Sequence, residues 1–249
     1  MIRYLKGLVR KTFNLIGLDV VRISKSPMYS FLGLKNLPIR TIIDVGANTG
    51  QFAKMISGIF PEAHIYSFEP LPEPFKQLKE WADQQNGRVT VFSVALGDEE
   101  GEVKMFSHVE HSPSSSFLKN TKICETLYPF AQKQVSVPVK VTTLDKWTKS
   151  LSSPPAPEIL IKSDVQGYED RVIRGGTETF RKAKACILEV CLDQLYENQA
   201  TFKDILFLLD GLGYHYVGNY NQTYADDGHV IFIDAVFMRQ HAKTRDLWN

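Results

Sequence analysis

The sequence predicts an α/β fold with a mostly parallel sheet, an antiparallel last hairpin and helices on both faces. From about Ile39 onward, short apolar runs rich in β-branched residues alternate with amphipathic helical stretches. This pattern is typical of parallel strands joined by crossover helices. The strand runs are almost continuously apolar, as expected for strands that are covered on both faces. A chain of 249 residues can bury one sizeable core, so a single α/β domain accounts for the pattern.

In the first half of the chain, the expected strands and helices alternate regularly. We expect strands at residues 41–45, 64–68 and 89–94 and helices at residues 51–59 and 73–84. Further strands at residues 102–106 and 135–141 flank a polar stretch that includes residues 112–116. This stretch is too polar for a core, and it lies where a substrate loop or lid could form.

The alternation resumes after a proline-rich stretch at residues 154–157, which we interpret as a connecting loop. Strands are expected at residues 158–163, 185–191, 214–218 and 230–238, and helices at residues 171–180 and 202–212. The order helix, strand, strand at the end of this pattern predicts an antiparallel hairpin at one edge of an otherwise parallel sheet.

The N-terminal part, residues 1–38, differs from the main domain, residues 39–249, and we expect it to be a basic amphipathic helical extension. Basic and apolar residues are interleaved from about Ile2 to Ile16, without the continuous apolar region or cleavage site of a signal peptide. We expect this helix to pack on the main domain. Peripheral contact with a membrane surface is the less favoured alternative.

Charge and cysteine content narrow the functional classes. The net charge is +1, whereas a nucleic-acid binder more often has a strong basic excess, so we expect no nucleic-acid partner. The chain has three cysteines, of which Cys186 and Cys191 lie five residues apart in one expected strand. This odd spacing places them on opposite faces, where they cannot form a disulfide. We therefore expect a reducing, cytoplasmic location.

A glycine-containing turn follows the first expected strand and opens the first expected helix. The sequence of the turn is DVGANTG, residues 44–50, and Glu69 lies nineteen residues further on, at the end of the second strand. Glycines let the backbone bend sharply and approach a ligand closely. A carboxylate at the position of Glu69 can accept both hydroxyls of a ribose. The turn alone could be purely structural, but together with Glu69 it indicates a nucleoside-type cofactor.

Two classes of cofactor suit this arrangement. A dinucleotide site would have the spacing G-x-G-x-x-G, which is absent here. Asp44 would repel a pyrophosphate, whereas it can orient the ammonium group of an amino acid. S-adenosylmethionine (SAM) has a ribose, no phosphate and two positive groups, so it fits better than NAD. The expected SAM-binding residues are Asp44, Gly46, Asn48, Gly50 and Glu69.

Ala95 and Leu96 form a third element of the expected cofactor site. They lie at the end of the third expected strand, in the sequence ALGD. This places them at the same edge of the sheet as the glycine turn, where an adenine ring would lie. An ordinary turn is an equally good interpretation of this segment.

A second group of carboxylates is expected at the same edge. Asp164 follows the strand at residues 158–163, and Glu189 lies within the neighbouring apolar strand. A buried acid there is unfavourable unless it has a partner or a role in the chemistry. Glu169 begins the next helix, whose dipole would stabilise it without any catalytic role. The catalytic candidates are Asp164, Glu169 and Glu189, and Asp164 and Glu189 would be the ligands of a divalent cation if one is used.

Two further groups of residues have weaker functional interpretations. His108 and His111 would converge on a metal only in a helix, whereas the surrounding pattern predicts a strand that runs into an exposed loop. Four tyrosines near the C-terminus could line a pocket for a sugar-like acceptor, or serve only as strand residues. They are Tyr214, Tyr216, Tyr220 and Tyr224.

Five motifs follow one another along the chain: IIDVGANTG, YSFEP, VALGD, VTTLDKW and IKSDVQGYE. Together and in this order they resemble those of the FkbM family of SAM-dependent methyltransferases, over roughly residues 39 to 240. The resemblance implies a Rossmann-like class I methyltransferase fold with a seven-stranded sheet, and methyl transfer that is usually to oxygen. The residues that fall on the family motifs are Asp44, Gly46, Asn48, Gly50 and Glu69 for the cofactor, and Asp164 and Glu169 after the fourth strand. Ser163 stands where we expect an apolar residue in the family.

The sequence therefore predicts a SAM-dependent methyltransferase that methylates a hydroxyl group of a small molecule or carbohydrate. A positioned base or a divalent cation could activate the hydroxyl, and the sequence leaves both open. The alternatives are a nicotinamide-dependent oxidoreductase and a nucleic-acid methyltransferase. The first lacks G-x-G-x-x-G and a Tyr-x-x-x-Lys pair. The second is disfavoured by the near-neutral net charge and by the absence of an Asn/Asp-Pro-Pro-aromatic motif.

Overall fold

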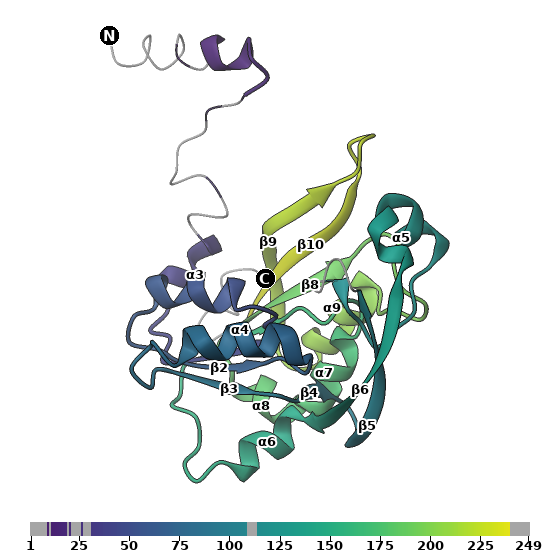
Figure 1. Ribbon diagram of the computed structural model, residues 1–249. Helices are drawn as coiled ribbons and strands as arrows, with labels where there is room; N and C mark the ends of the chain where they lie inside the picture. The colour runs from purple at the N-terminus through teal and green to yellow at the C-terminus, as the bar shows by residue number, and fades with distance from the viewer. Residues whose placement is uncertain are drawn as a thin grey trace, which may run out of the picture.

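The computed structural model describes residues 9, 11–18, 20, 26, 31–108 and 114–239. Its main feature is a seven-stranded sheet with the strand order β3-β2-β1-β7-β8-β10-β9 (Figure 1). Five neighbouring strands run parallel, and β10 is antiparallel to both β8 and β9. The strands are β1 Thr41–Val45, β2 His64–Phe68, β3 Val89–Phe92, β7 Ile159–Ser163, β8 Ala185–Cys191, β9 Tyr214–Tyr224 and β10 Val230–Arg239. The predicted mostly parallel sheet with an antiparallel last hairpin is confirmed.

Helices cover both faces of this sheet, as predicted. One apolar cluster joins β1 and β7 to the first group of helices, and a second cluster joins β7 and β8 to the other group. The first group is η2 Phe31–Asn36, α3 Gln51–Ile59 and α4 Pro72–Ala82. The second group is α6 Leu144–Ser150, α7 Glu169–Gly175, α8 Thr177–Lys182 and α9 Phe202–Asp210. The central parallel strands β1, β7 and β8 are buried at every position, which explains why their sequences are mostly apolar.

A second, three-stranded sheet differs from the sequence prediction. It consists of β4 Ala95–Gly97, β5 Gly101–His108 and β6 Gln134–Thr143, in the order β4-β6-β5. The third strand of the main sheet ends at Phe92, and Ala95 pairs with Val141 of β6 instead of continuing it. Ala95, Val139 and Val141 share a small apolar cluster. The apolar run at residues 89–97 therefore divides between two sheets, which its composition alone does not indicate.

The helix expected at residues 171–180 is also different, because it is divided into α7 and α8 at Gly176. A Cβ atom on Gly175 would lie 1.9 Å from the carbonyl oxygen of Gly97. The glycine thus allows the end of α7 to touch the backbone of β4. A short helix α5 Lys122–Leu127 and the 3-10 helix η4 Pro129–Gln132 lie between β5 and β6.

The few described residues before Phe31 do not show the packing that the sequence suggests. Among the described residues there, Leu15 is 86% exposed and Ile16 is 70% exposed, so neither side chain is buried against the main domain. In contrast, Phe31 and Leu34 of η2 are buried in the core. The division at residue 38 stays a prediction. No helix in the described ranges is long and apolar enough to cross a membrane.

The cysteines are arranged as the sequence predicts. Cys124, Cys186 and Cys191 are buried free thiols. Cys186 belongs to the core cluster that contains the helices α6 to α9, whereas Cys191 belongs to a separate cluster with Cys124. The two cysteines of β8 therefore lie on opposite faces of the sheet, because the side chains of a strand alternate.

Candidate active site

The glycine turn after β1 is in direct contact with the residue that follows β7. Gly46 has a φ of 77°, and a Cβ atom on it would lie 1.9 Å from the backbone oxygen of Asp164. The backbone N–H of Asp164 donates a hydrogen bond of 3.0 Å to the carbonyl of Val45. A side chain at position 46 would separate the two segments, so Gly46 allows the glycine turn to lie against Asp164.

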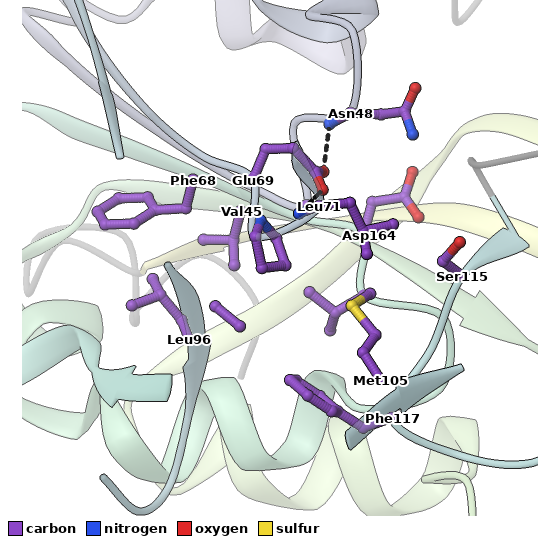
Figure 2. A pocket seen from close by; sticks show the side chains of 14 residues that line it. Val45, Asn48, Phe68, Glu69, Leu71, Leu96, Met105, Ser115, Phe117 and Asp164 are labelled. Atoms are coloured by element: carbon purple, nitrogen blue, oxygen red, sulfur yellow. Dashed lines mark hydrogen bonds between the residues drawn. The ribbon is translucent and has the colours of Figure 1, made fainter. Parts of the chain in front are cut away.

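Glu69 is held at the same edge by two backbone amides. Its Oε2 accepts a hydrogen bond of 2.9 Å from the N–H of Asn48, and its Oε1 accepts one of 2.8 Å from the N–H of Leu71 (Figure 2). The residue is 4% exposed, and burial raises the pKa of its carboxyl to about 7. Each oxygen retains a lone pair, so an ionised Glu69 can still accept the two hydroxyls of a ribose.

A pocket of about 500 Å³, including the space at its opening to solvent, lies beside Glu69. Its polar side is formed by the glycine turn, Glu69 and Asp164, and its apolar side by Leu96 and by side chains of the small sheet region. Figure 2 shows Leu96, Met105 and Phe117 below the carboxylates of Glu69 and Asp164. A carboxylate for ribose hydroxyls beside an apolar slot for a flat ring fits the adenosine part of SAM.

The small sheet explains how Ala95 and Leu96 reach this pocket. Both residues line it, although they belong to β4 and not to the end of the third strand of the main sheet. The polar stretch before Phe117 also contributes, because Ser115 lines the pocket and is 5% exposed. The sequence pattern suggested that this stretch was too polar to be buried, which is wrong for Ser115 and Ser116.

A second pocket of about 810 Å³ opens on the other side of the glycine turn. It shares Gly46, Asn48 and Asp164 with the first pocket. The other lining residues are Asp44, Ala47, Gln51, Phe52, Met55, Lys162, Tyr220 and Asp234. The two pockets therefore meet at the glycine turn and at Asp164.

Asp44 lies at the base of the second pocket. It is 1% exposed, and the hydroxyl of Ser67 lies 3.4 Å from its Oδ2. Burial raises the pKa of Asp44 to about 7, although the nearby ammonium group of Lys162 lowers it. A buried carboxylate with this affinity for protons gains a favourable partner when a cationic group binds beside it.

Lys162 and Asp234 form a buried ion pair that the sequence analysis missed. The Nζ of Lys162 lies 2.7 Å from Oδ1 of Asp234 and 3.5 Å from Oδ2 of Asp164. Burial lowers the pKa of Lys162, but the charges of Asp234, Asp164 and Glu189 raise it by more, so this lysine stays protonated. The sequence does show one charged residue within the apolar run of β7 and one within that of β10. That the two form a pair depends on the order of the strands in the sheet.

Asp164 is more exposed than the sequence suggests. Its side chain is 32% exposed, so it is open to both pockets instead of being sealed in the core. It also has partners, since Lys162 lies nearby and the side-chain amide of Gln166 donates a hydrogen bond of 2.8 Å to its Oδ1. The predicted need for a partner is therefore met by a cation and an amide.

Glu169 and Glu189 are the two other carboxylates that the sequence predicts near Asp164. Glu169 is the first residue of α7, is 2% exposed, and accepts a hydrogen bond of 2.9 Å from the N–H of Val165. Burial raises the pKa of Glu169 to about 8. Burial also raises the pKa of Glu189 well above its usual range, and the charge of Asp164 raises it further. Among the described residues that line the two pockets, neither Glu169 nor Glu189 occurs.

Comparison with known proteins decides the family. The family model described as the methyltransferase FkbM domain matches residues 44–216. The chain belongs to this family. An FkbM methyltransferase uses SAM, and the region matched contains Glu69 of the first pocket together with the glycine turn and Asp164, where the two pockets meet.

Individual relatives of this FkbM methyltransferase are more distant. It is 28% identical over 183 residues to the 2-O-methyltransferase NoeI of Sinorhizobium fredii, an alignment that covers 72% of this chain and 74% of NoeI. It is 27% identical over 147 residues to the hexuronic acid methyltransferase AglP of Haloferax volcanii, with 59% and 54% covered. A crystal structure of methyltransferase FkbM from Methylobacillus flagellatus matches 81% of this chain and 44% of that chain, with 13% identity and a TM-score of 0.49.

The remaining candidate residues of this FkbM methyltransferase are divided between core and surface. Of the four tyrosines, Tyr220 lines the second pocket. Tyr214 donates a hydrogen bond to the carbonyl of Phe180 inside the core, while Tyr216 and Tyr224 are exposed. The prediction for His111 concerns a position outside the described residues. In the described part of the chain, no group of three or more His, Cys, Asp and Glu side chains could hold a metal ion.

Proposed function

We propose that this protein transfers a methyl group from SAM to a hydroxyl group of a carbohydrate. The observation that carries the proposal is the position of Asp164, which lines both pockets. One pocket suits adenosine, and the other has carboxylates that can accept hydrogen bonds from a polyhydroxylated ring. The names of two relatives, a 2-O-methyltransferase and a hexuronic acid methyltransferase, support a sugar as the acceptor.

Each residue of the site has a role in binding under this proposal. Glu69 accepts the ribose hydroxyls, and Ala95 and Leu96 pack against the adenine ring. Asp44 lines the second pocket, so the amino-acid end of the cofactor would pass the glycine turn and reach into the part of that pocket beside Asp44, where its ammonium group complements a buried carboxylate. Gly46 and Gly50 shape the turn, and Asn48 holds Glu69 through its backbone N–H.

The chemistry needs the acceptor oxygen to be aligned and its proton to be removed. Bound SAM supplies a methyl group on a positively charged sulfur, which leaves with the carbon–sulfur electron pair as the acceptor oxygen bonds to carbon. Asp164 accepts the hydroxyl proton, because it is the exposed carboxylate at the junction of the pockets. Lys162 lies 3.5 Å from Asp164 and is itself held by Asp234. A positioned base of this kind contributes about 10²–10⁴-fold to a rate.

We propose this proton transfer in preference to activation by a divalent cation. The ammonium group of Lys162 already lies between Asp164 and Asp234, and the amide of Gln166 joins Asp164 to Glu189. Turnover should therefore be unchanged by EDTA. Loss of turnover in EDTA, restored by Mg²⁺ or Mn²⁺ in the wild type only, would show that a metal ion activates the acceptor instead.

The cellular setting is also proposed from the residues. Three buried free thiols support a reducing, cytoplasmic location. The net charge of +1 supports a small-molecule or carbohydrate acceptor over nucleic acid. We further propose that residues 39–249 form the methyltransferase domain and residues 1–38 an extension to it.

An acceptor screen tests the proposed function. The protein would be incubated with SAM labelled in its methyl group and with neutral sugars, uronic acids, catechols and short RNAs. We expect label in a sugar, and we expect it to resist mild alkali, because a methyl ether is stable where a methyl ester is hydrolysed. Label that is found only in RNA, or only in an alkali-labile ester, would contradict transfer to a sugar hydroxyl.

A further inference from the structure

The second pocket has an aromatic side chain that the core holds in place. Tyr220 of β9 lines this pocket and is half-buried. Its ring stacks on that of Phe31, with the ring centroids 4.9 Å apart and an angle of 23° between the planes. Phe31 is 2% exposed, so it gives Tyr220 a rigid support. Phe52 and Met55 of α3 also line the pocket, and the hydroxyl of Tyr220 lies 3.9 Å from the sulfur of Met55. The pocket therefore has an apolar part with a fixed aromatic ring.

The charged part of the same pocket is mainly acidic. Among the described residues that line it, the charged ones are Asp44, Asp164, Asp234 and Lys162. Under the proposed function, the ammonium group of SAM pairs with Asp44, which leaves Asp164 and Asp234 for the acceptor. Each carboxylate oxygen can accept two hydrogen bonds, so both groups can accept hydroxyls of an acceptor in addition to their present partners.

Lys162 is the one cation among those lining residues, and its charge is already balanced. Its Nζ lies 2.7 Å from Oδ1 of Asp234 and 3.5 Å from Oδ2 of Asp164, and its side chain is 5% exposed. The carboxylate of an acidic acceptor would have to draw Lys162 away from these partners or remain without a counter-ion. A carboxylate without a counter-ion is unfavourable in an enclosed site, and one that faces other carboxylates is also repelled. The charges of the pocket therefore favour an acceptor that donates hydrogen bonds and has no negative charge.

We propose that the second pocket binds an uncharged pyranose sugar, with the C–H groups of the sugar on Tyr220 and its hydroxyls on Asp164 and Asp234, and that it rejects the corresponding uronic acid. This inference rests on the proposed function, in which the acceptor is a carbohydrate, and it adds which carbohydrates fit. A pyranose ring has C–H groups on its faces and hydroxyls around its edge. The pocket has the same division between an aromatic ring and hydrogen-bond acceptors. Tyr220 thus contributes affinity for the ring, and Asp234 contributes selection by charge.

The test measures the binding of matched sugars to the protein saturated with S-adenosylhomocysteine, so it needs no turnover. The probes are methyl glycosides of glucose, galactose and mannose, the uronic acid that corresponds to each, and the uncharged amide of each uronic acid. Saturation-transfer NMR at pH 8 with EDTA gives the affinities, and EDTA ensures that no metal ion acts as a counter-ion. In the series that binds best, we expect the neutral sugar and the amide to bind alike and the acid to bind at least about tenfold more weakly. An acid that binds as tightly as its amide, or no binding of any neutral probe, would overturn the proposal.

Asp234→Asn tests whether the charges of this pocket cause the selection. The variant keeps the shape of the side chain, removes one negative charge and leaves Lys162 with a single carboxylate partner. We expect the preference for the amide over the acid to become several-fold smaller. Asp227→Asn is the matched control, because Asp227 lies in the loop between β9 and β10 with a side chain that is 73% exposed, where its charge is screened by salt. The same preference in Asp234→Asn as in the wild type, or an equal change in Asp227→Asn, would contradict the proposal.

Tyr220→Ala tests the aromatic contact. We expect this variant to bind the neutral sugar about tenfold more weakly, which is the scale of one aromatic contact, whereas Tyr220→Phe keeps the ring and should bind as the wild type does. Tyr224→Ala is the control, because Tyr224 also belongs to β9 but is 57% exposed, and we expect its affinity to be unchanged. Full affinity in Tyr220→Ala would overturn the role of Tyr220. If a variant does not fold, the comparison of acid and amide in the wild type still decides the selection by charge.

Methyl transfer is measured separately, with SAM labelled in its methyl group and the same probes. Neutral sugars that bind with the expected selectivity but receive no label would show that the proposed function is wrong and that the inference about the pocket is right. Transfer to the uronic acids at least as fast as to the neutral sugars would show the reverse.

Discussion

Glu69 has a buried carboxyl and a proposed role in cofactor binding. Its pKa of about 7 is set by burial, and two backbone amides lower it from what burial alone would give. Because the ribose hydroxyls need the ionised form, S-adenosylhomocysteine should bind more weakly as the pH falls below about 7. The loss approaches about tenfold per pH unit, which corresponds to one proton taken up. Isothermal titration calorimetry between pH 5.5 and 8.5 measures it.

Variants of Glu69 separate its contribution from that of Asp44, whose pKa is also about 7. Glu69→Gln should show a smaller dependence of affinity on pH than the wild type. Glu69→Ala should weaken binding at neutral pH by about 1–3 kcal/mol, the scale of hydrogen bonds to a charged group. Equal affinity for wild type and Glu69→Ala would show that Glu69 does not contact the ribose.

Gly46 is the residue at which backbone geometry matters most. Gly46→Ala would place a Cβ atom 1.9 Å from the Asp164 carbonyl, in a backbone conformation with a φ of 77°. We expect a loss of about 1–3 kcal/mol of unfolding free energy from the conformation alone, together with weaker S-adenosylhomocysteine binding. Gly58→Ala is the control, because Gly58 lies in α3 with no atom within 4 Å of its added Cβ. Urea unfolding should show that Gly46→Ala lowers the unfolding free energy and that Gly58→Ala raises it, because alanine favours a helix more than glycine does. Two equal effects would contradict the account.

At the same scale, the sequence indicated that Glu69 and the glycine turn lie at one edge of the sheet, but it did not indicate the side chains that contact Asp164. Glu69 and the turn could be recognised because their spacing follows from one strand-turn-helix unit. Lys162, Asp234 and Gln166 were not selected, because their contacts depend on which strands are neighbours. Asp234 lies seventy-two residues from Lys162 in the chain, and the pair forms only when β10 and β7 are placed in one sheet.

At the scale of elements, the buried carboxyl of Glu169 at the start of α7 makes the stability of the folded protein depend on pH. Glu169 has a pKa of about 8 in the folded chain because of burial, against an ordinary value of 4.5. The folded state therefore binds this proton more tightly, and stability falls as the pH rises from about 4.5 to 8. One such group contributes up to about 1.4 kcal/mol per pH unit. Glu169→Gln keeps an acceptor for the N–H of Val165 and has no charge.

We expect Glu169→Gln to remove the part of the pH dependence of the unfolding free energy that Glu169 causes. Urea unfolding at pH 5, 6, 7 and 8 should show the variant gaining stability relative to the wild type as the pH rises. The raised pKa values of Asp44, Glu69 and Glu189 affect the pH dependence of stability in the same direction. Because these residues are present in both proteins, the difference between wild type and variant reports on Glu169 alone. Parallel curves for the two proteins would show that Glu169 is ionised at no cost, and the account of α7 would be wrong.

The elements themselves were largely predictable. The parallel strands could be found from apolar runs, and the last hairpin from its position after the final helix. Two details were not predictable from pattern alone. The apolar run at residues 89–97 is divided between the main sheet and the small sheet. The helix expected at residues 171–180 is divided at Gly176, next to the contact of Gly175 with β4. In both cases, tertiary contacts overrode a continuous local pattern.

At the scale of the whole molecule, the N-terminal segment and the site are separate features. The residues proposed to bind SAM all lie after Ile39, so deletion of residues 1–25 should leave affinity for S-adenosylhomocysteine within a few-fold. The segment has six basic residues and one acid, and the attraction of such exposed charges to anionic lipids is largely screened at physiological salt. We expect no flotation of the full-length protein with anionic vesicles. Robust flotation that is lost on deletion and weakens with salt would contradict this.

The central claim is that the two pockets meet at Asp164 and that the methyl group is transferred there. The most direct test compares wild type and Asp164→Asn, which has the same shape without the charge, for turnover on the acceptor found by screening and for S-adenosylhomocysteine affinity. The account predicts that kcat falls at least 10²-fold while affinity changes only a few-fold. A variant that turns over at the wild-type rate would show that Asp164 is structural and would contradict the claim.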